Sequence, residues 1–197
     1  MIEKAIDYAR GIFAGDSSGH DFDHTMRVYR MATRIAMEEN ADLQIVQLAA
    51  LLHDVDDRKL SPGTCENKDN AVSFLRLNGV EEGKIRRIVQ IISEISFSAN
   101  KGVPTTIEGK CVQDADRLDA IGAIGIGRAF AYGGSRGRAI HDPTGADQTS
   151  TIQHFYDKLL LLKDLMNTAT GRHLAQRRHS FMCVFLEQFY GEWDGKM

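Results

Sequence analysis

The sequence predicts an all-α protein, a helical bundle that forms a single domain over residues 1–197. Apolar residues recur three and four positions apart along most of the chain, which is the spacing of one helical face. No segment shows the alternation of apolar and polar residues that a half-buried strand requires. With only 3 prolines and 43% hydrophobic residues, the chain has the composition of an ordinary globular protein.

The first three predicted helices are recognised by their apolar faces and their ends. A helix over residues 2–13 has apolar residues at a 4-3-4 spacing, and Gly15 favours its end. A second helix follows over residues 24–40. A third, over residues 42–54, contains the most hydrophobic run of the protein, LAALLH.

Two further helices and a loop are predicted in the middle of the chain. One helix covers residues 69–77 and is ended by Asn78-Gly79, because both residue types favour a helix C-terminus. The next covers residues 81–96 and carries isoleucines on one side. Residues 97–109 have the composition of turns and predict a loop.

The last predicted helices cover residues 110–130, 148–168 and 172–190. Between the first two of them lies YGGSRGRAIHDPTGAD, the longest stretch of loop composition. No repeat or linker divides the chain.

Charge and cysteine content narrow the function classes. The net charge of -3 and the pI near 6.2 argue against a broad surface for nucleic-acid polymers. The number of cysteines is odd, and Cys65, Cys111 and Cys183 are widely spaced along the chain. This pattern favours reduced thiols over a set of disulfide bonds. No secretory leader and no apolar run of about 20 residues is visible. The expected protein is therefore cytoplasmic and has no membrane partner.

Two histidine positions lie on apolar helical faces. His24 stands one turn before Val28, so its imidazole should point inward; taken alone, this pattern is typical of a hydrogen-bonded core histidine. His53-Asp54 ends the most hydrophobic helix, where a buried carboxylate is costly unless it is paired or binds a metal. The partial negative charge at a helix C-terminus also favours a cation there.

The dipeptide His-Asp is not specific by itself. It occurs at residues 20–21, 53–54 and 141–142. The first copy lies in a Ser/Gly-rich stretch and the third is followed by proline. Only the second copy follows an apolar helical run, so His53-Asp54 is the candidate for metal binding.

The order His24, His53-Asp54 and Asp116, the last in DADRLDA, resembles the HD-domain superfamily of metal-dependent phosphohydrolases. The resemblance extends over nearly the whole chain. It is closest to small bacterial hydrolases that share HDFDHTMRV-like, LLHDVDD and DADRLDAIG segments. It implies that these four residues bind one divalent cation inside a helical bundle. The metal-binding core would cover residues 20–130, followed by C-terminal helices over 148–190.

The ligand set suits Mn²⁺, Fe²⁺, Co²⁺ or Ni²⁺ as well as Mg²⁺. Dinuclear members of the superfamily have additional histidines between the HD pair and the last aspartate. This sequence has no histidine between Asp54 and Asp116, so we expect one cation and hydrolysis rather than oxygen chemistry. Glu66, Asp69 and Glu94 remain candidates for a second ion.

Residues just after the HD pair are candidates for catalysis and phosphate binding. Asp57 is predicted to orient or deprotonate the attacking water, because related nucleotidases and alarmone hydrolases carry an acid at this offset. Alternatively, Asp56 and Asp57 cap the next turn. Arg58 and Lys59 either hold phosphate or form a solvated charge pair.

Further polar residues lie near the expected ligands. His20 is interpreted as a substrate contact or as a loop-packing residue. Arg27 would contact phosphate or orient an acid. Asp114 is predicted to be solvated, and Asp119 to lie near a ligand histidine.

The glycines after residue 120 do not predict a dinucleotide loop, because GAIGIG lacks the GxGxxG order and follows a helix. Gly122, Gly125 and Gly127 are predicted to allow close helix packing. The loop over 133–147 carries arginines and is interpreted either as a flap over phosphates or as a segment without function.

Two functions follow from these observations. The first is a metal-dependent phosphohydrolase acting on a small phosphorylated metabolite, with a nucleotide as leading substrate and phosphate or pyrophosphate as product. The alternative is a non-catalytic, metal-containing module that binds or senses nucleotides. Asp57 distinguishes them, because a sensor has no need for an acid beside the metal. The oligomeric state stays open, with a homodimer as one possibility.

Overall fold

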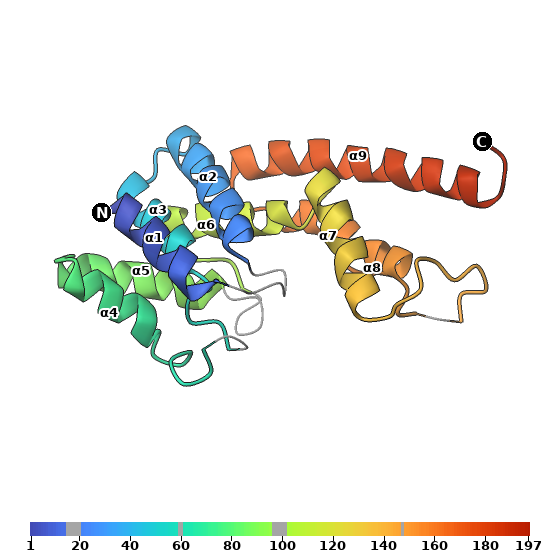
Figure 1. The fold of residues 1–197 in the computed structure, drawn as a ribbon. Helices are drawn as coiled ribbons and strands as arrows, with labels where there is room; N and C mark the ends of the chain where they lie inside the picture. The colour runs from blue at the N-terminus through green and yellow to red at the C-terminus, as the bar shows by residue number, and fades with distance from the viewer. Residues whose placement is uncertain (15–20, 59–60, 96–101, 147) are drawn as a thin grey trace. The chain divides into compact units, whose positions relative to one another are not determined.

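A computed structural model describes residues 1–14, 21–58, 61–95, 102–146 and 148–197. These residues form helices and contain no strand, which confirms the predicted all-α class (Figure 1). The chain divides into two compact units, Met1–Asp116 and Arg117–Met197. None of the described helices combines the length and the hydropathy that a bilayer crossing requires. The single domain over 1–197 stays a prediction.

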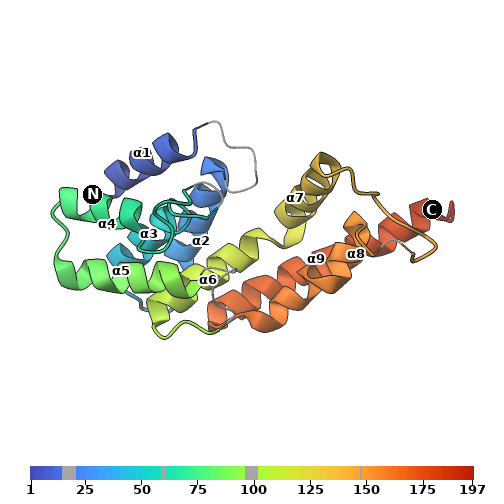
Figure 2. The same ribbon diagram turned by 90° about the horizontal axis from the view of Figure 1, so that it is seen from below.

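The first unit is built around a central hydrophobic helix. Its helices are α1 (Ile2–Ile12), α2 (Phe22–Glu38), α3 (Leu43–Leu52), α4 (Asp69–Leu77), α5 (Glu82–Ile95) and α6 (Ile107–Asp119) as far as Asp116. Helix α3 packs against α1, α2 and α5, and Figure 2 shows it lying between α1 and α5. Helix α3 is apolar on most of its surface because these three neighbouring helices cover it. Burial of each leucine or isoleucine side chain contributes about 1.5–3 kcal/mol to the free energy of folding.

Side-chain caps begin the two helices that matter most for the site. The carboxylate of Asp21 accepts a hydrogen bond from the His24 amide at 2.7 Å, so α2 begins two residues earlier than predicted. Asp42 accepts from the amides of Gln44 and Ile45 at 3.1 and 3.2 Å and starts α3. Such caps satisfy amides that have no partner within the helix.

The second unit contains α7 (Gly122–Ser135), α8 (Thr151–Asp157), the 3₁₀-helix η1 (Leu159–Leu165) and α9 (Ala169–Trp193). The long helix α9 packs against α7 and η1, while α8 contacts η1 and α7. Phe130, Phe155 and Phe185 bring three of these elements together, with ring centroids 5.9–6.0 Å apart.

The predicted helix over 110–130 is wrong in its middle, because α6 and α7 are separate helices. Gly122 has φ +78°, a conformation that favours glycine, and it interrupts the helix. At Gly125 an added Cβ would lie 2.3 Å from the Ala120 carbonyl oxygen, so only glycine fits this close approach. The predicted close helix packing therefore holds at Gly122, which faces Arg178 of α9. Gly125 is restricted by the turn before α7 rather than by another helix, and Gly127 has open space around it.

Three other boundaries differ from prediction. Helix α7 continues to Ser135, so the expected loop over 132–147 begins later than its glycines suggest. The predicted helix over 148–168 is α8 followed by η1, with Lys158 at φ -140° between them. Helix α6 begins at Ile107, three residues before the prediction.

Candidate metal centre

His24 lies in the first turn of α2 and points into the first unit. Its side chain is 2% exposed. The Nε2 atom lies 3.6 Å from Asp54 Oδ2 and 3.5 Å from Asp116 Oδ1. The apolar series that begins at this position therefore does carry the imidazole inward, as predicted.

His53 and Asp54 follow directly after the last residue of α3. The His53 ring lies edge-on to that of His24, with centroids 5.4 Å apart. Its Nδ1 lies 2.8 Å from the Ala50 carbonyl oxygen, and its Nε2 lies 3.1 Å from Asp54 Oδ2. The free carbonyl oxygens at the end of α3 thus supply the partner that orients the imidazole.

Asp116 comes from α6 and completes the group. Its side chain is 31% exposed, whereas those of His24 and His53 are 2% and 3% exposed. The four predicted ligands are therefore gathered in one place, with a buried side formed by the imidazoles and a more open side at Asp116. His24, His53 and Asp54 offer ligand atoms within 4.8 Å of one another.

The residues present fit a divalent cation. When His53 Nδ1–H donates to Ala50, the neutral ring presents a lone pair at Nε2. That lone pair faces the Asp54 carboxylate, another acceptor, at 3.1 Å. A proton or a cation must lie between them. Two ligands at right angles around one ion lie about 3 Å apart when each metal–ligand bond is near 2.1 Å, which matches this spacing.

The pKa of His53 reflects the same geometry. Burial lowers this pKa, but the carboxylates of Asp54 and Asp116 and the hydrogen bond to Ala50 outweigh burial and raise it to about 9. In the metal-free protein a proton therefore occupies the position that suits a cation. Mixed imidazole and carboxylate ligands are those that Mn²⁺, Fe²⁺, Co²⁺ and Ni²⁺ accept.

Asp56 is a structural residue rather than a ligand. Its buried carboxylate accepts hydrogen bonds from the amides of Asn70 and Ala71 at 3.1 and 3.0 Å, in the first turn of α4. The Asn70 side chain donates in turn to the Val55 carbonyl at 3.1 Å. Of the two aspartates for which capping was an alternative, Asp56 caps α4. Sequence reasoning could not assign this role, because the partners lie fourteen and fifteen residues further along the chain.

Asp57 lies half-buried in the turn after the HD pair. Its amide donates to the Asp54 carbonyl at 2.9 Å, which places it one turn beyond that ligand. Arg58 is exposed and Arg27 is half-buried on α2. The predicted substrate contacts His20 and Lys59 lie outside the described residues.

The structure corrects the prediction for Asp114 and shows an ion pair of Asp119 that was not predicted. Asp114, predicted to be solvated, is fully buried, because it lies on the inner face of α6. Asp119 is also buried and forms an ion pair with Arg128 at 2.6 Å. Its predicted position beside a ligand histidine stays a prediction.

Comparison with known proteins identifies relatives over almost the full length. The family model for the HD domain matches residues 21–121, which contain all four candidate ligands. The uncharacterized protein YpgQ of Bacillus subtilis is 43% identical over 198 residues, covering 99% of this chain and 95% of that protein.

Solved structures give the same result. A crystal structure of an HD-superfamily hydrolase from Bacillus thuringiensis has a TM-score of 0.84 at 44% identity, covering 98% of this chain and 96% of the other. The crystal structure of B. subtilis YpgQ in complex with ADP has a TM-score of 0.81 at 38% identity, covering 97% and 94%. The resemblance seen in the sequence is confirmed, and the chain belongs to the HD domain family.

Proposed function

We propose that this protein is a divalent-metal-dependent phosphohydrolase that acts on a small phosphorylated metabolite, with a nucleotide as substrate. The observation that carries the proposal is the gathering of His24, His53, Asp54 and Asp116, with Asp116 on the more exposed side. A ligand set with one accessible side leaves room for a water and a phosphate oxygen, which a purely structural metal site does not need.

A divalent cation held by these residues would lower the pKa of a bound water and offset negative charge on the phosphoryl group. His53 and His24 would contribute neutral ligands, with His53 held in the required tautomer by Ala50. We assign Asp57 the task of accepting the proton of the attacking water, one turn beyond Asp54.

The phosphate contacts are assigned to basic residues around the ligands. Arg27 follows His24 by three positions on α2, so both lie on neighbouring parts of one helical face. Arg58 is exposed next to Asp57 and is free to turn toward a phosphate. We include His20 and Lys59 in this set on sequence grounds.

A nucleotide is proposed because the related YpgQ has been crystallised with ADP. Attack on a monoester would release phosphate, and attack within a polyphosphate would release pyrophosphate. The released product therefore reports which phosphorus atom is attacked.

The test is release of phosphate and pyrophosphate from a panel of nucleotides with Mn²⁺, Mg²⁺, Co²⁺ or Ni²⁺. We expect metal-dependent release that is lost in His53→Ala and reduced at least about a hundredfold in Asp57→Asn. Arg30→Ala, an exposed change on the same helix as Arg27, serves as the matched control for Arg27→Ala.

The alternative of a nucleotide sensor gives the opposite pattern. A sensor would bind nucleotide tightly in the presence of metal without turnover. Binding would then be unchanged by Asp57→Asn, because no proton transfer is needed. This result in a protein that retains its metal would overturn the hydrolase.

A further inference from the structure

Helix α9 has 25 residues and carries a row of exposed side chains along one side. The row consists of His173, Arg177, Ser180, Val184 and Glu187, which recur at alternating spacings of four and three residues. This is the spacing of the seam along which one helix packs lengthwise against another. We call these five residues the exposed row.

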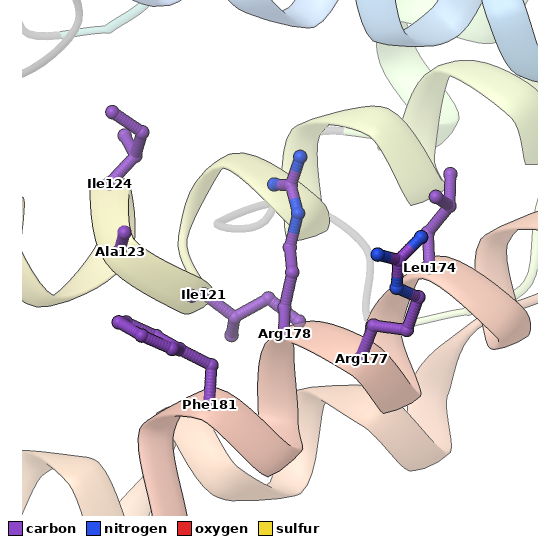
Figure 3. A pocket seen from close by; sticks show the side chains of 8 residues that line it. Ile121, Ala123, Ile124, Leu174, Arg177, Arg178 and Phe181 are labelled. Atoms are coloured by element: carbon purple, nitrogen blue, oxygen red, sulfur yellow. The ribbon is translucent and has the colours of Figure 1, made fainter. Parts of the chain in front are cut away.

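Apolar side chains lie exposed at the middle of this row. Val184 is 62% exposed, and Phe181, which directly follows Ser180, is 51% exposed. Figure 3 shows the Phe181 ring extending toward the part of α7 that carries Ile124, at the edge of a hollow of about 490 Å³. Ile124 is exposed as well. Neighbouring exposed apolar side chains of this kind indicate a surface that another molecule covers.

Opposite charges lie on either side of this apolar centre. Arg177 lies one turn before Ser180, and Glu187 lies one turn after Val184. Neither charged residue forms an ion pair or a side-chain hydrogen bond with any residue that the structure describes. The sequence also places no opposite charge three or four positions from either of them on α9. The exposed row therefore carries a cation before its centre and an anion after it.

This order of charges is complementary to itself when a second α9 runs antiparallel to the first. Arg177 lies five residues before Met182 and Glu187 five residues after it, which is about 7.5 Å along the axis in each direction. A two-fold axis at Met182 brings Arg177 of each copy level with Glu187 of the other, and Ser180 level with Val184. Parallel packing would instead place like charges opposite each other.

We propose that a second copy of this chain binds along the exposed row, with the two α9 helices antiparallel. Arg177 and Glu187 form two equivalent ion pairs, and the two Phe181 rings lie beside each other next to the two-fold axis. The occupant is a second copy because an interface with two-fold symmetry requires a surface that matches itself. The proposal does not depend on hydrolysis, because it uses none of the candidate metal ligands.

The first measurement is the dissociation constant of the dimer, by sedimentation equilibrium. A single pair of helices gives an interface at the small end of the usual range, so we expect a dissociation constant on the order of 10 µM. A chain that stays monomeric at about 200 µM would overturn the proposal.

Charge reversal tests the pairing itself. Arg177→Glu and Glu187→Arg should each weaken the dimer at least about tenfold, because each places like charges opposite each other twice. An equimolar mixture of the two variants should dimerise with about the wild-type dissociation constant, since every pair across the mixed dimer then has opposite charges. A mixture that binds no more tightly than the single variants would contradict the antiparallel pairing.

Matched controls separate this pairing from the net charge of the protein. Arg86→Glu and Glu38→Arg change the charge by the same amounts at exposed positions of α5 and α2. We expect each of them to leave the dissociation constant within about twofold of the wild-type value. Weakening equal to that of the α9 variants would overturn the proposed surface.

The apolar contact is tested with exposed positions, where neither change threatens folding. Phe181→Ala should weaken the dimer about fivefold, because each ring is covered by the other copy. Leu77→Ala, on α4 and even more exposed, should leave the dimer unchanged. Equal effects of the two changes would contradict a place for Phe181 in the interface.

The same register brings Cys183 of the two copies close together. Cys183 is exposed and follows Met182, so the two cysteines lie about 3 Å apart along the axis. A short bismaleimide should link the dimer covalently in the wild-type protein and in Cys65→Ser, but not in Cys183→Ser. A link that persists in Cys183→Ser, or no link in a protein that is dimeric, would contradict the antiparallel register.

Discussion

His53 Nε2 lies 3.1 Å from Asp54 Oδ2, although adjacent side chains point about 100° apart around a helix. His53 is the C-cap of α3 and keeps helical dihedrals, with φ -61° and ψ -34°, and Asp54 follows it in the turn after the helix. The two adjacent side chains therefore meet at the end of α3, where both can bind the same ion. Several measurable consequences follow from this arrangement and from the contacts around it.

Metal binding should stabilise the folded protein. At a free Mn²⁺ concentration of about 100 times Kd, we expect the free energy of unfolding to rise by about 2.7 kcal/mol. The increase should vanish in Asp116→Asn, which changes the most exposed ligand and so leaves the core intact. Urea unfolding with Mn²⁺ and with EDTA measures it. His173→Ala, an exposed histidine on α9, should keep the full increase.

Without metal, stability should depend on the protonation of His53. Its pKa is raised from 6.5 to about 9 by the neighbouring carboxylates, which outweigh burial. A raised pKa favours folding below the unfolded value of about 6.5, and this contribution is lost as the pH rises through about 9. We expect the EDTA-treated protein to lose up to about 3 kcal/mol between pH 6.5 and pH 9.5 relative to His53→Gln.

Saturating Mn²⁺ should remove that loss, because a cation takes the place of the proton between His53 and Asp54. Urea unfolding at both pH values, for both proteins, gives the comparison. A metal-free protein whose pH dependence equals that of His53→Gln would contradict the geometry described for the Nε2 atom.

The cap that Asp56 provides to α4 should be worth about 2 kcal/mol. Asp56→Ala removes a buried carboxylate that accepts two amide hydrogen bonds, and leaves both amides without a partner. Asp69→Ala is the matched control, because Asp69 is exposed in the same turn and should contribute only about 0.5 kcal/mol through the helix dipole. Chemical denaturation measures the free energy of unfolding of both variants. Equal losses of this free energy would contradict the assignment of Asp56 as the cap of α4.

Two glycines of α7 should respond in opposite ways to the same change. Gly125→Ala places a Cβ 2.3 Å from the Ala120 carbonyl oxygen, so we expect a loss of at least about 2 kcal/mol. Gly127→Ala meets no atom within 4 Å and should raise stability by about 0.5–1 kcal/mol, because alanine favours a helix. Thermal unfolding distinguishes the two signs.

Much of the fold could be predicted because local spacing and burial agree. Helices α1, α4 and α5 follow their predicted ranges to within one residue, since each has a clear apolar face. The breaks at Gly122 and Lys158 could not be predicted. They depend on packing between residues whose neighbours are unknown from sequence, and both segments are apolar enough to continue as helices.

The site could be predicted in part. His24 and the His53-Asp54 pair are polar residues at apolar positions, which is a signal that sequence alone contains. Asp116 needed the family pattern, because Asp114 is equally acidic and is in fact the more buried of the two. The Ala50 carbonyl that orients His53 has no sequence signal at all, since any residue type supplies it.

The two hydrogen bonds of Asn70, from its amide to Asp56 and from its side chain to the Val55 carbonyl, also bear on how this protein could vary. They join residues 55 and 56, directly after His53 and Asp54, to the first turn of α4. Insertions within residues 61–68 should then leave His53 and Asp54 in place, because closing a longer loop adds little entropy. For a designer, these residues are a place where the length of the chain can change while the metal ligands keep their positions.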